Sequence, residues 1–337
     1  MARSARRYSD EDVEHYDRPR RRTRPRTKER PAYDDAVAGV VVTVDRGRFT
    51  LLVETSDGPV TVMAMKARPL GRKGVVVGDR VRVVGDVSGA EGSLARIVEV
   101  EPRTTVLRRT ADDDDPVERV VVANATQLVV VTALADPEPR TGLIDRALVA
   151  AYDAGMAPLL CLTKADLADP QTLLATYRSL GVPWVVTQKG GDLSELRERL
   201  AGETSVLLGH SGVGKSTLVN ALVPDAGREV GVVNAVTGRG RHTSTSALLL
   251  PLPGGGWIVD TPGIRSFGLA HVEPGDLIKA FPDLEEMTVD CPRGCTHGVE
   301  EPECGLDLAI ERGELDADRV ASFRRLLEAR SVPAYLL

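Results

Sequence analysis

After its first 35 residues, the chain shows short runs of apolar positions of the kind that form β-strands. Runs rich in Val and other β-formers occupy 37–44, 49–54, 60–65 and 95–100, and 74–84 contains two extended pieces around Gly78 and Asp79. Turn-type residues at 45–47 and 56–59 separate the first runs. Five short strands at 36–105 fit a small closed barrel of the OB type, and a small SH3-like barrel fits nearly as well.

Beyond a polar segment at 112–116, the pattern changes to alternating strands and helices. Strands are expected at 128–132, 158–162, 184–186, 206–208, 247–252 and 257–259. Helical periodicity is found at 143–154, 171–180 and 193–200, and again from Lys215 onwards. Repeated β–α units of this kind predict an α/β domain at 116–270, with a parallel sheet and helices on both of its faces.

The region 271–337 is polar at first and then helical from about Leu306 to Arg330, and it holds a cluster of metal-binding residue types. Cys291, Cys295 and Cys304 lie within fourteen residues, with His297 between them. Three thiolates and an imidazole suit tetrahedral Zn²⁺, and because all four ligands are protein groups the site is expected to be structural. We therefore predict a zinc-binding helical domain at 271–337 that holds one zinc ion.

Composition and charge narrow the classes of function. The chain has 337 residues, of which 42% are hydrophobic and 27% charged, as expected for a soluble protein of two or three domains. We expect neither a membrane span nor a secretory signal, because the sequence has no sufficiently long apolar run. The net charge of −6 argues against a uniformly basic nucleic-acid binder. The first thirty residues nevertheless carry eleven Arg or Lys, so 1–35 is expected to be a disordered basic tail that is either solvated or bound to phosphate backbones.

The segment 209–216 fits the phosphate-loop pattern G-x-x-x-x-G-K-[ST]. Backbone N–H groups of such a loop hold phosphate oxygens, while Lys215 would contact the β- and γ-phosphates and Ser216 would offer its hydroxyl to Mg²⁺. An apolar strand precedes the loop and a helix follows it, which is the context this motif requires. The expected nucleotide-binding residues here are Gly209, His210, Ser211, Gly212, Val213, Gly214, Lys215, Ser216 and Thr217.

A second motif, Asp260-Thr261-Pro262-Gly263, follows an apolar strand about 45 residues after the phosphate loop. P-loop proteins hold Mg²⁺ with a carboxylate at the end of the strand beside the loop, so Asp260 is the candidate, acting through water. Gly263 would offer its N–H to the γ-phosphate. This pair of motifs does not by itself distinguish guanine from adenine.

The tetrapeptide Thr163-Lys164-Ala165-Asp166 makes that distinction. It follows an apolar strand and resembles the Asn-Lys-x-Asp motif of GTPases, with Thr in the first position. Asp166 would accept hydrogen bonds from N1–H and the exocyclic amine of guanine, and the stem of Lys164 would cover the base. The Thr163 hydroxyl can still tie this loop to the phosphate loop.

The order of the motifs is unusual, because the base-reading motif precedes the phosphate loop by about 45 residues. In ordinary GTPases it lies well after Asp-x-x-Gly. The strands can keep their places in the sheet if the chain ends are moved to the vicinity of Pro116 and Gly268. We therefore predict a circularly permuted GTPase domain, whose switch segments lie close to the C-terminal domain.

The segment 237–245 has the position of switch I, which normally supplies a Thr to Mg²⁺. Thr243 and Thr245 are the candidates, and a solvated basic loop is the alternative. The place of the usual water-orienting Gln is taken by Ile264, which cannot orient water. Catalytic roles are assigned to Lys215, Thr243 and His242. His242 would orient the attacking water, and the alternative is that it contacts phosphate or RNA. GTP turnover without a partner that completes the site should be slow.

Taken together and in this order, these motifs resemble the circularly permuted small ribosomal subunit biogenesis GTPases, the RsgA/YjeQ family. The resemblance covers about residues 36–330 and includes Gly-Arg-Gly-Arg-His-Thr at 238–243. It implies an N-terminal OB fold, a C-terminal zinc domain and a cytoplasmic bacterial GTPase that binds the 30S subunit and its 16S rRNA. In this family, subunit-stimulated hydrolysis is coupled to checking or release late in maturation. The chain departs from the pattern at Thr163 and in having three residues, not four, between Cys291 and Cys295.

Three classes of function remain to be compared. The first is a slow GTPase that converts GTP to GDP and phosphate, is activated by the 30S subunit and is a monomer by default. The second is an rRNA-docking scaffold in which the nucleotide only sets conformation, against which the intact Lys215, Ser216 and Asp260 argue. The third is a P-loop ATPase or small-molecule kinase, for which Asp166 would have no use.

Overall fold

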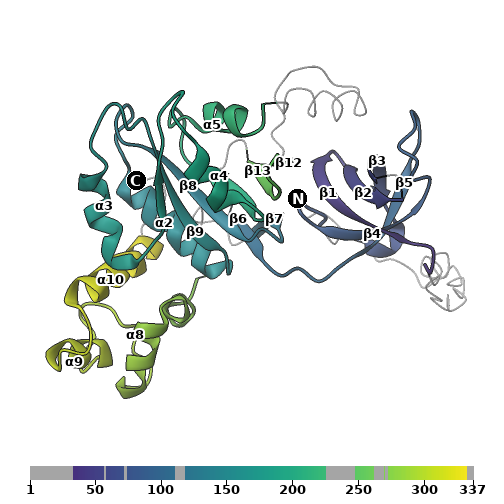
Figure 1. Cartoon of the computed structure of the whole chain (residues 1–337). Helices are drawn as coiled ribbons and strands as arrows, with labels where there is room; N and C mark the ends of the chain where they lie inside the picture. The colour runs from purple at the N-terminus through teal and green to yellow at the C-terminus, as the bar shows by residue number, and fades with distance from the viewer. Residues whose placement is uncertain are drawn as a thin grey trace, which may run out of the picture. The chain divides into compact units, whose positions relative to one another are not determined.

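The computed structural model describes residues 33–56, 58–71, 74–110, 118–224, 247–261, 269 and 272–331 (Figure 1). Most of the basic tail predicted at 1–35, the polar segment at 112–116 and the whole of 237–245 lie outside these ranges. Residues 35–337 form one compact unit. Among the helices described, none combines the length and hydrophobicity needed to cross a bilayer. The division into domains at 36–105, 116–270 and 271–337 remains a prediction.

The first five strands close into a barrel, as predicted. Strands β1, β2 and β3 are joined by antiparallel pairing, β3 runs parallel to β5, and β4 pairs with both β5 and β1. This order is that of an OB-type Greek-key barrel. Of the two extended pieces expected in 74–84, only the second is a strand, because the first makes just one bridge, from Val77 to Val122. The strands are β1 (Val37–Asp45), β2 (Arg48–Thr55), β3 (Gly58–Lys66), β4 (Arg80–Gly85) and β5 (Ala95–Val100).

A two-stranded antiparallel sheet that the sequence did not predict follows the barrel, formed by β6 (Val106–Thr110) and β7 (Glu118–Ala123). Asn124, directly after β7, accepts a hydrogen bond from the Thr104 N–H at 2.9 Å and donates one to the Gly78 carbonyl at 2.9 Å. A Cβ atom at Gly78 would lie 2.1 Å from the Ala123 carbonyl oxygen, so only glycine fits this approach.

The α/β part contains the predicted parallel sheet, in the order β10, β9, β8, β11, β13, with β12 antiparallel at the side of β13. The inner strand β8 is buried along its whole length, as an apolar run in a parallel sheet should be. The strands are β8 (Gln127–Ala133), β9 (Ala157–Thr163), β10 (Trp184–Val186), β11 (Thr204–Leu208), β12 (Leu248–Pro251) and β13 (Trp257–Asp260).

Helices cover both faces of this sheet, also as predicted. Side chains alternate along β8, so that Leu128 and Val130 pack on one core and Val129 and Val131 on the other. The first core includes residues of α2 (Thr141–Asp153) and α3 (Gln171–Tyr177), which η2 (Arg178–Leu180) extends. The second core includes residues of α4 (Ser194–Leu200) and α5 (Lys215–Leu222). The sole cysteine of the sheet, Cys161, is fully buried in the second core.

The single helix expected at 306–330 is two helices. The first ends where Gly313 adopts a left-handed φ of 72°, with its N–H bonded to the Ile310 carbonyl and that of Glu314 bonded to Ala309. Asp316 then accepts the Asp318 N–H at 2.8 Å and starts the second helix. The remaining elements that the structure describes are η1 (Arg68–Leu70), α7 (Pro274–Leu277), η3 (Ile278–Ala280), α8 (Pro282–Glu286), η4 (Met287–Asp290), α9 (Gly305–Glu311) and α10 (Ala317–Ser331).

Helix α10 packs on α2 through charged side chains that are almost completely buried. Asp145 and Arg146 on α2 are 3% and 2% exposed. The Arg325 guanidinium donates to the Asp145 carboxylate at 3.1 Å, and Arg146 donates to the Ala329 carbonyl at 3.1 Å. Buried charges are tolerated only when paired, so this contact ties the C-terminal helix firmly to the α/β core.

Candidate functional site

The predicted motifs meet at one edge of the parallel sheet. Strands β9, β11 and β13 all run in the same direction, so their carboxyl ends lie side by side. Thr163 ends β9, the phosphate loop follows β11, and Asp260 ends β13. Ligand sites of open α/β sheets form at this edge, outside the carboxyl ends of the strands.

The loop between β11 and α5 has the tight geometry that a phosphate cradle needs. A Cβ atom at Gly209 would lie 2.2 Å from the Val131 carbonyl oxygen, so only glycine lets the loop begin so close to β8. Gly214 has a φ of 94° and forms the N-cap of α5. The Lys215 ammonium donates to the Gly209 carbonyl and to the His210 carbonyl, the latter at 3.3 Å. Exposed Ser216 lies in the first turn of α5, whose positive end faces the loop.

Asp260 lies directly beside the strand that leads into the loop, in register with Leu207. Burial raises the pKa of Asp260 above its usual range, and the nearby Lys215 ammonium partly opposes this rise. The side chain of the next residue, Thr261, donates to the Leu207 carbonyl at 3.2 Å and joins the two strand ends. A partly buried carboxylate at this position can serve a hard divalent cation such as Mg²⁺. The other predicted contacts, Gly263, His242, Thr243 and Thr245, lie outside the described residues.

The base-reading loop is joined to the phosphate loop by the Thr163 hydroxyl, as predicted from the sequence. This buried hydroxyl donates to the Val213 carbonyl at 2.6 Å and lies 3.3 Å from the Thr132 carbonyl. Lys164 has a φ of 58°, and its ammonium donates to the Asp136 carbonyl. Asp166 is exposed, so its carboxylate is accessible to a ligand.

Replacement of Thr163 by Val should weaken guanine-nucleotide binding about 5-fold, because one buried hydrogen bond contributes about 1 kcal/mol. The Val213 carbonyl would lose its donor, and the two loops would no longer be held together. Titration of a fluorescent GDP analogue measures the effect. Thr163→Ser keeps the hydroxyl and serves as the control, so equal losses in both variants would contradict this role of the bond.

Two further segments reach this edge without having been predicted. Thr187, directly after β10, donates its N–H to the Leu162 carbonyl at 2.7 Å and accepts the Ala165 N–H at 3.2 Å. It therefore supports the base-reading loop, and its place after the predicted strand at 184–186 was a usable signal. The second segment contains Pro137, which lies near Gly212. A Cβ atom built on Gly212 would be 3.6 Å from the Pro137 ring. No sequence pattern predicts this contact or the hydrogen bond between the Lys164 ammonium and the Asp136 carbonyl.

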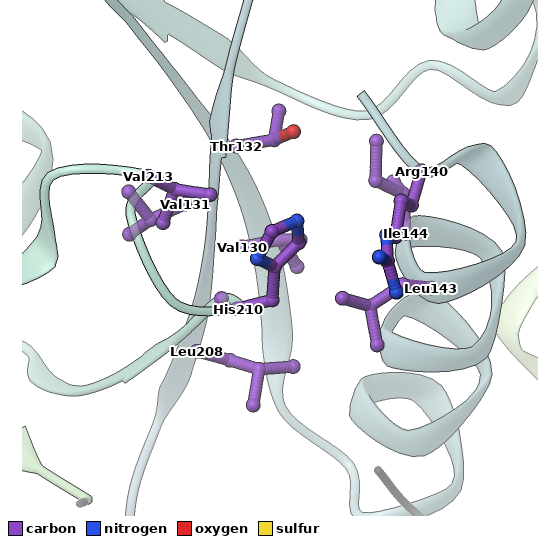
Figure 2. A pocket seen from close by; sticks show the side chains of 10 residues that line it. Val130, Val131, Thr132, Arg140, Leu143, Ile144, Leu208, His210 and Val213 are labelled. Carbon is purple, nitrogen blue, oxygen red and sulfur yellow. The ribbon is translucent and has the colours of Figure 1, made fainter. Parts of the chain in front are cut away.

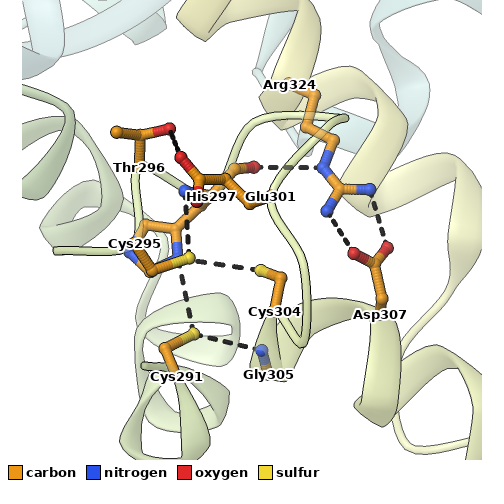
Figure 3. A network of polar contacts seen from close by, with 9 residues as sticks. All are labelled: Cys291, Cys295, Thr296, His297, Glu301, Cys304, Gly305, Asp307 and Arg324. Atoms are coloured by element: carbon orange, nitrogen blue, oxygen red, sulfur yellow. Dashed lines mark hydrogen bonds and ion pairs between the residues drawn. The ribbon is translucent and has the colours of Figure 1, made fainter. Parts of the chain in front are cut away.

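The Cys₃His cluster is assembled as predicted, with its four ligand atoms all within 4.8 Å of one another (Figure 3). The His297 Nδ1 atom lies 3.5 Å from the sulfurs of Cys291 and Cys295 and 3.9 Å from that of Cys304. Zinc–ligand bonds of about 2.0 and 2.3 Å at tetrahedral angles place nitrogen and sulfur about 3.5 Å apart. The four residues therefore fit a tetrahedral zinc ion, and the three-residue spacing between the first two cysteines does not prevent it.

The surroundings of the cluster hold its cysteine and histidine ligands in place. The Gly305 N–H donates to the Cys291 sulfur at 3.1 Å, and a Cβ atom on Gly305 would lie 2.4 Å from the Met287 carbonyl. The Arg324 guanidinium on α10 donates to the His297 carbonyl at 3.0 Å (Figure 3). Burial raises the pKa of the Cys295 thiol to about 12, so a metal ion must displace a proton to bind there. Such outer contacts orient metal ligands in proteins.

Comparisons with known proteins agree with this geometry. A family profile described as RsgA GTPase matches residues 100–270, half of the chain. A protein of Alcanivorax borkumensis, described as small ribosomal subunit biogenesis GTPase RsgA, is 41% identical over 286 residues, or 81% of this chain and 79% of that protein. The crystal structure of YjeQ from Thermotoga maritima matches with a TM-score of 0.66 and 29% identity, over 88% of this chain and 99% of that one. YloQ, described as a circularly permuted GTPase, matches with a TM-score of 0.64 and 25% identity, over 88% and 96%.

Proposed function

Because the chain belongs to the RsgA GTPase family and is a circularly permuted GTP hydrolase, we propose that it acts on the small ribosomal subunit. It binds the 30S particle and its 16S rRNA late in maturation and couples GTP hydrolysis to checking or release. The observation that carries this proposal is the similarity to a small ribosomal subunit biogenesis GTPase over 81% of the chain. The N-terminal barrel supports it, because OB folds commonly bind RNA.

The nucleotide contacts divide between the two loops. GTP places its phosphates in the loop 209–217, where backbone N–H groups and Lys215 contact phosphate oxygens. Asp166 reads the guanine edge, with the stem of Lys164 over the base. Gly263 contacts the γ-phosphate. Support comes from the position of both loops at one sheet edge and from the bond between the Thr163 hydroxyl and the Val213 carbonyl.

Hydrolysis requires a water molecule in line with the γ-phosphate. When bound, Mg²⁺ neutralises charge on the β- and γ-phosphate oxygens. Ser216, Asp260 and either Thr243 or Thr245 are the residues that would hold it. His242 orients the attacking water, whose oxygen forms a bond to the γ-phosphorus while the bond to the GDP oxygen breaks. Without the ribosomal subunit this arrangement is incomplete and turnover is slow.

The remaining parts of the chain serve binding rather than chemistry. One structural zinc ion on Cys291, Cys295, His297 and Cys304 holds the loop before α9 in shape. The basic tail at 1–35 adds an anchor for rRNA phosphates. The protein works as a monomer in the cytoplasm.

GTP hydrolysis with and without purified 30S subunits tests the proposal. We expect at least about 10-fold stimulation by 30S, none by 50S, and no stimulated turnover of ATP, because a partner completes a slow site. Lys215→Ala, which lacks the phosphate-contacting ammonium, reports background from contaminating enzymes. If 30S binds without changing turnover, the second candidate, an rRNA-docking scaffold in which nucleotide sets conformation only, is favoured. If 30S neither binds nor stimulates, the ribosomal partner is wrong for this protein.

A further inference from the structure

His210, the second residue of the phosphate loop, points its ring into a small space between β8 and α2 (Figure 2). The space has a volume of about 10 Å³, which is room for no more than one water molecule. It is therefore no ligand pocket, and any role of the His210 ring concerns the loop that carries it.

One ring nitrogen of His210 contacts the loop itself. The Nδ1 atom lies 2.6 Å from the carbonyl oxygen of Ser211. A carbonyl only accepts hydrogen bonds, so Nδ1 must carry the hydrogen. The loop thereby selects a ring form that donates from Nδ1, and the bond holds the Ser211 carbonyl toward the ring.

The other ring nitrogen faces the buried space. The Nε2 atom is buried and has no hydrogen-bond partner among the described residues. Val130, Leu143 and Ile144 form apolar walls around it, while Arg140 and Thr132 supply the polar part of the lining (Figure 2). Because a buried hydrogen without an acceptor is costly, the ring tautomer that carries its hydrogen on Nδ1 and leaves Nε2 bare fits this environment best.

We propose that His210 is a positioning residue that sets the phosphate loop for nucleotide binding. In a planar trans peptide, a carbonyl and the following N–H point in opposite directions. The bond from His210 to the Ser211 carbonyl therefore directs the Gly212 N–H away from the ring and toward the side where phosphate binds. Gly212 has a φ of 86°, which permits this turn.

The same side chain also supports the lysine of the loop. The His210 carbonyl accepts the Lys215 ammonium at 3.3 Å, so a ring wedged between β8 and α2 fixes the peptide on which that ammonium rests. This role concerns GTP and GDP binding and is independent of any ribosomal partner.

Two substitutions separate the hydrogen bond from the volume of the ring. His210→Phe keeps the bulk but has no donor, and we expect about 10-fold weaker binding of both GTP and GDP, in line with the loss of one ordering hydrogen bond. His210→Asn places an amide N–H near the position of Nδ1 and should bind both nucleotides within about 3-fold of the native protein. Both variants should melt within about 3 °C of it, because a loop-side bond contributes little to the core.

Titration with fluorescent GTP and GDP analogues and thermal melting decide the matter. Native affinity in His210→Phe, or equal weakness in His210→Asn, would overturn the proposal. A fall in melting temperature large enough to explain the weaker binding would also overturn the proposal, because it would show that His210 only stabilises the fold. The ¹⁵N shifts of the imidazole give an independent readout. We expect a protonated Nδ1 and a bare Nε2, and the opposite tautomer would refute the assignment.

Discussion

Asp166→Asn is expected to lower GTP affinity by at least about 100-fold and to make xanthosine triphosphate the preferred nucleotide. A carboxylate accepts from both N1–H and the exocyclic amine of guanine, and hydrogen bonds to a charged group contribute about 1.5–3 kcal/mol each. The Asn amide offers only one acceptor and turns a donor toward the guanine amine. Xanthine carries a carbonyl in place of that amine, so the same donor finds an acceptor there.

Competition of GTP, xanthosine triphosphate and ATP against a fluorescent guanine nucleotide measures this change of specificity. Glu198→Gln on α4 removes one exposed carboxylate without touching the nucleotide loops, and it should leave all three affinities unchanged. A variant at position 166 that still prefers GTP would show that another group reads the base. Weakened binding of all nucleotides alike would point instead to a distorted loop.

Cys304→Ser is expected to abolish zinc binding and to lower the melting temperature by at least about 15 °C, because structural zinc contributes about 10 kcal/mol to folding. Cys304 is fully buried and is the N-cap residue of α9, so the metal joins the loop to the start of this helix. Loss of the metal also frees His297, whose carbonyl is held by Arg324 on α10. Since the next residue, Arg325, holds Asp145 on α2, the damage should spread into the α/β core.

Zinc content by atomic spectroscopy and melting curves with and without a chelator provide the test. Cys161→Ser is the matched control, because Cys161 is equally buried but lies in β9, where burial raises the pKa of its thiol to about 12. That variant should keep one zinc per chain and show a much smaller loss of stability. A Cys304→Ser protein that melts like the native one and retains zinc would contradict a four-ligand structural site.

The elements with strong apolar periodicity were predictable, whereas those held by distant partners were not. Strands such as β8 and β9 are continuous apolar runs and were placed to within one or two residues. The pair β6 and β7 was missed because charged Arg108 and Arg119 interrupt its apolar pattern and the acidic run at 112–115 indicates a linker. Pairing between two such segments depends on tertiary contacts that local propensity does not contain.

The division between α9 and α10 was missed for a different reason, since its signals are present in the sequence. Gly313 is suited to end a helix in a left-handed conformation, and Asp316 is a good N-cap for the next one. The prediction of one helical region at 306–330 did not take these two residues into account. Their capping propensities mark the boundary between the two helices.

The candidate site was predictable in its motifs but not in its internal bonds. The spacing of the phosphate loop, Asp260 and the base-reading loop predicted the permuted order, and the hydroxyl of Thr163 was correctly expected to join two of these loops. The contacts of Lys164 with the Asp136 carbonyl and of His210 with the Ser211 carbonyl involve backbone acceptors, which any residue type provides. Such contacts follow from the folded geometry alone.

The pairing of α2 with α10 has a consequence for the synthesis of the chain. Asp145 leaves the ribosome 180 residues before Arg325, which is a delay of about 9–36 s at ordinary rates of translation. Until then the nascent α/β core contains a carboxylate and the neighbouring Arg146 without their helix α10 partners. Burial of these charges is favourable only once α10 has emerged. The core is therefore completed only after α10 has been translated, and a chain cut short before α10 cannot reach the native packing of α2.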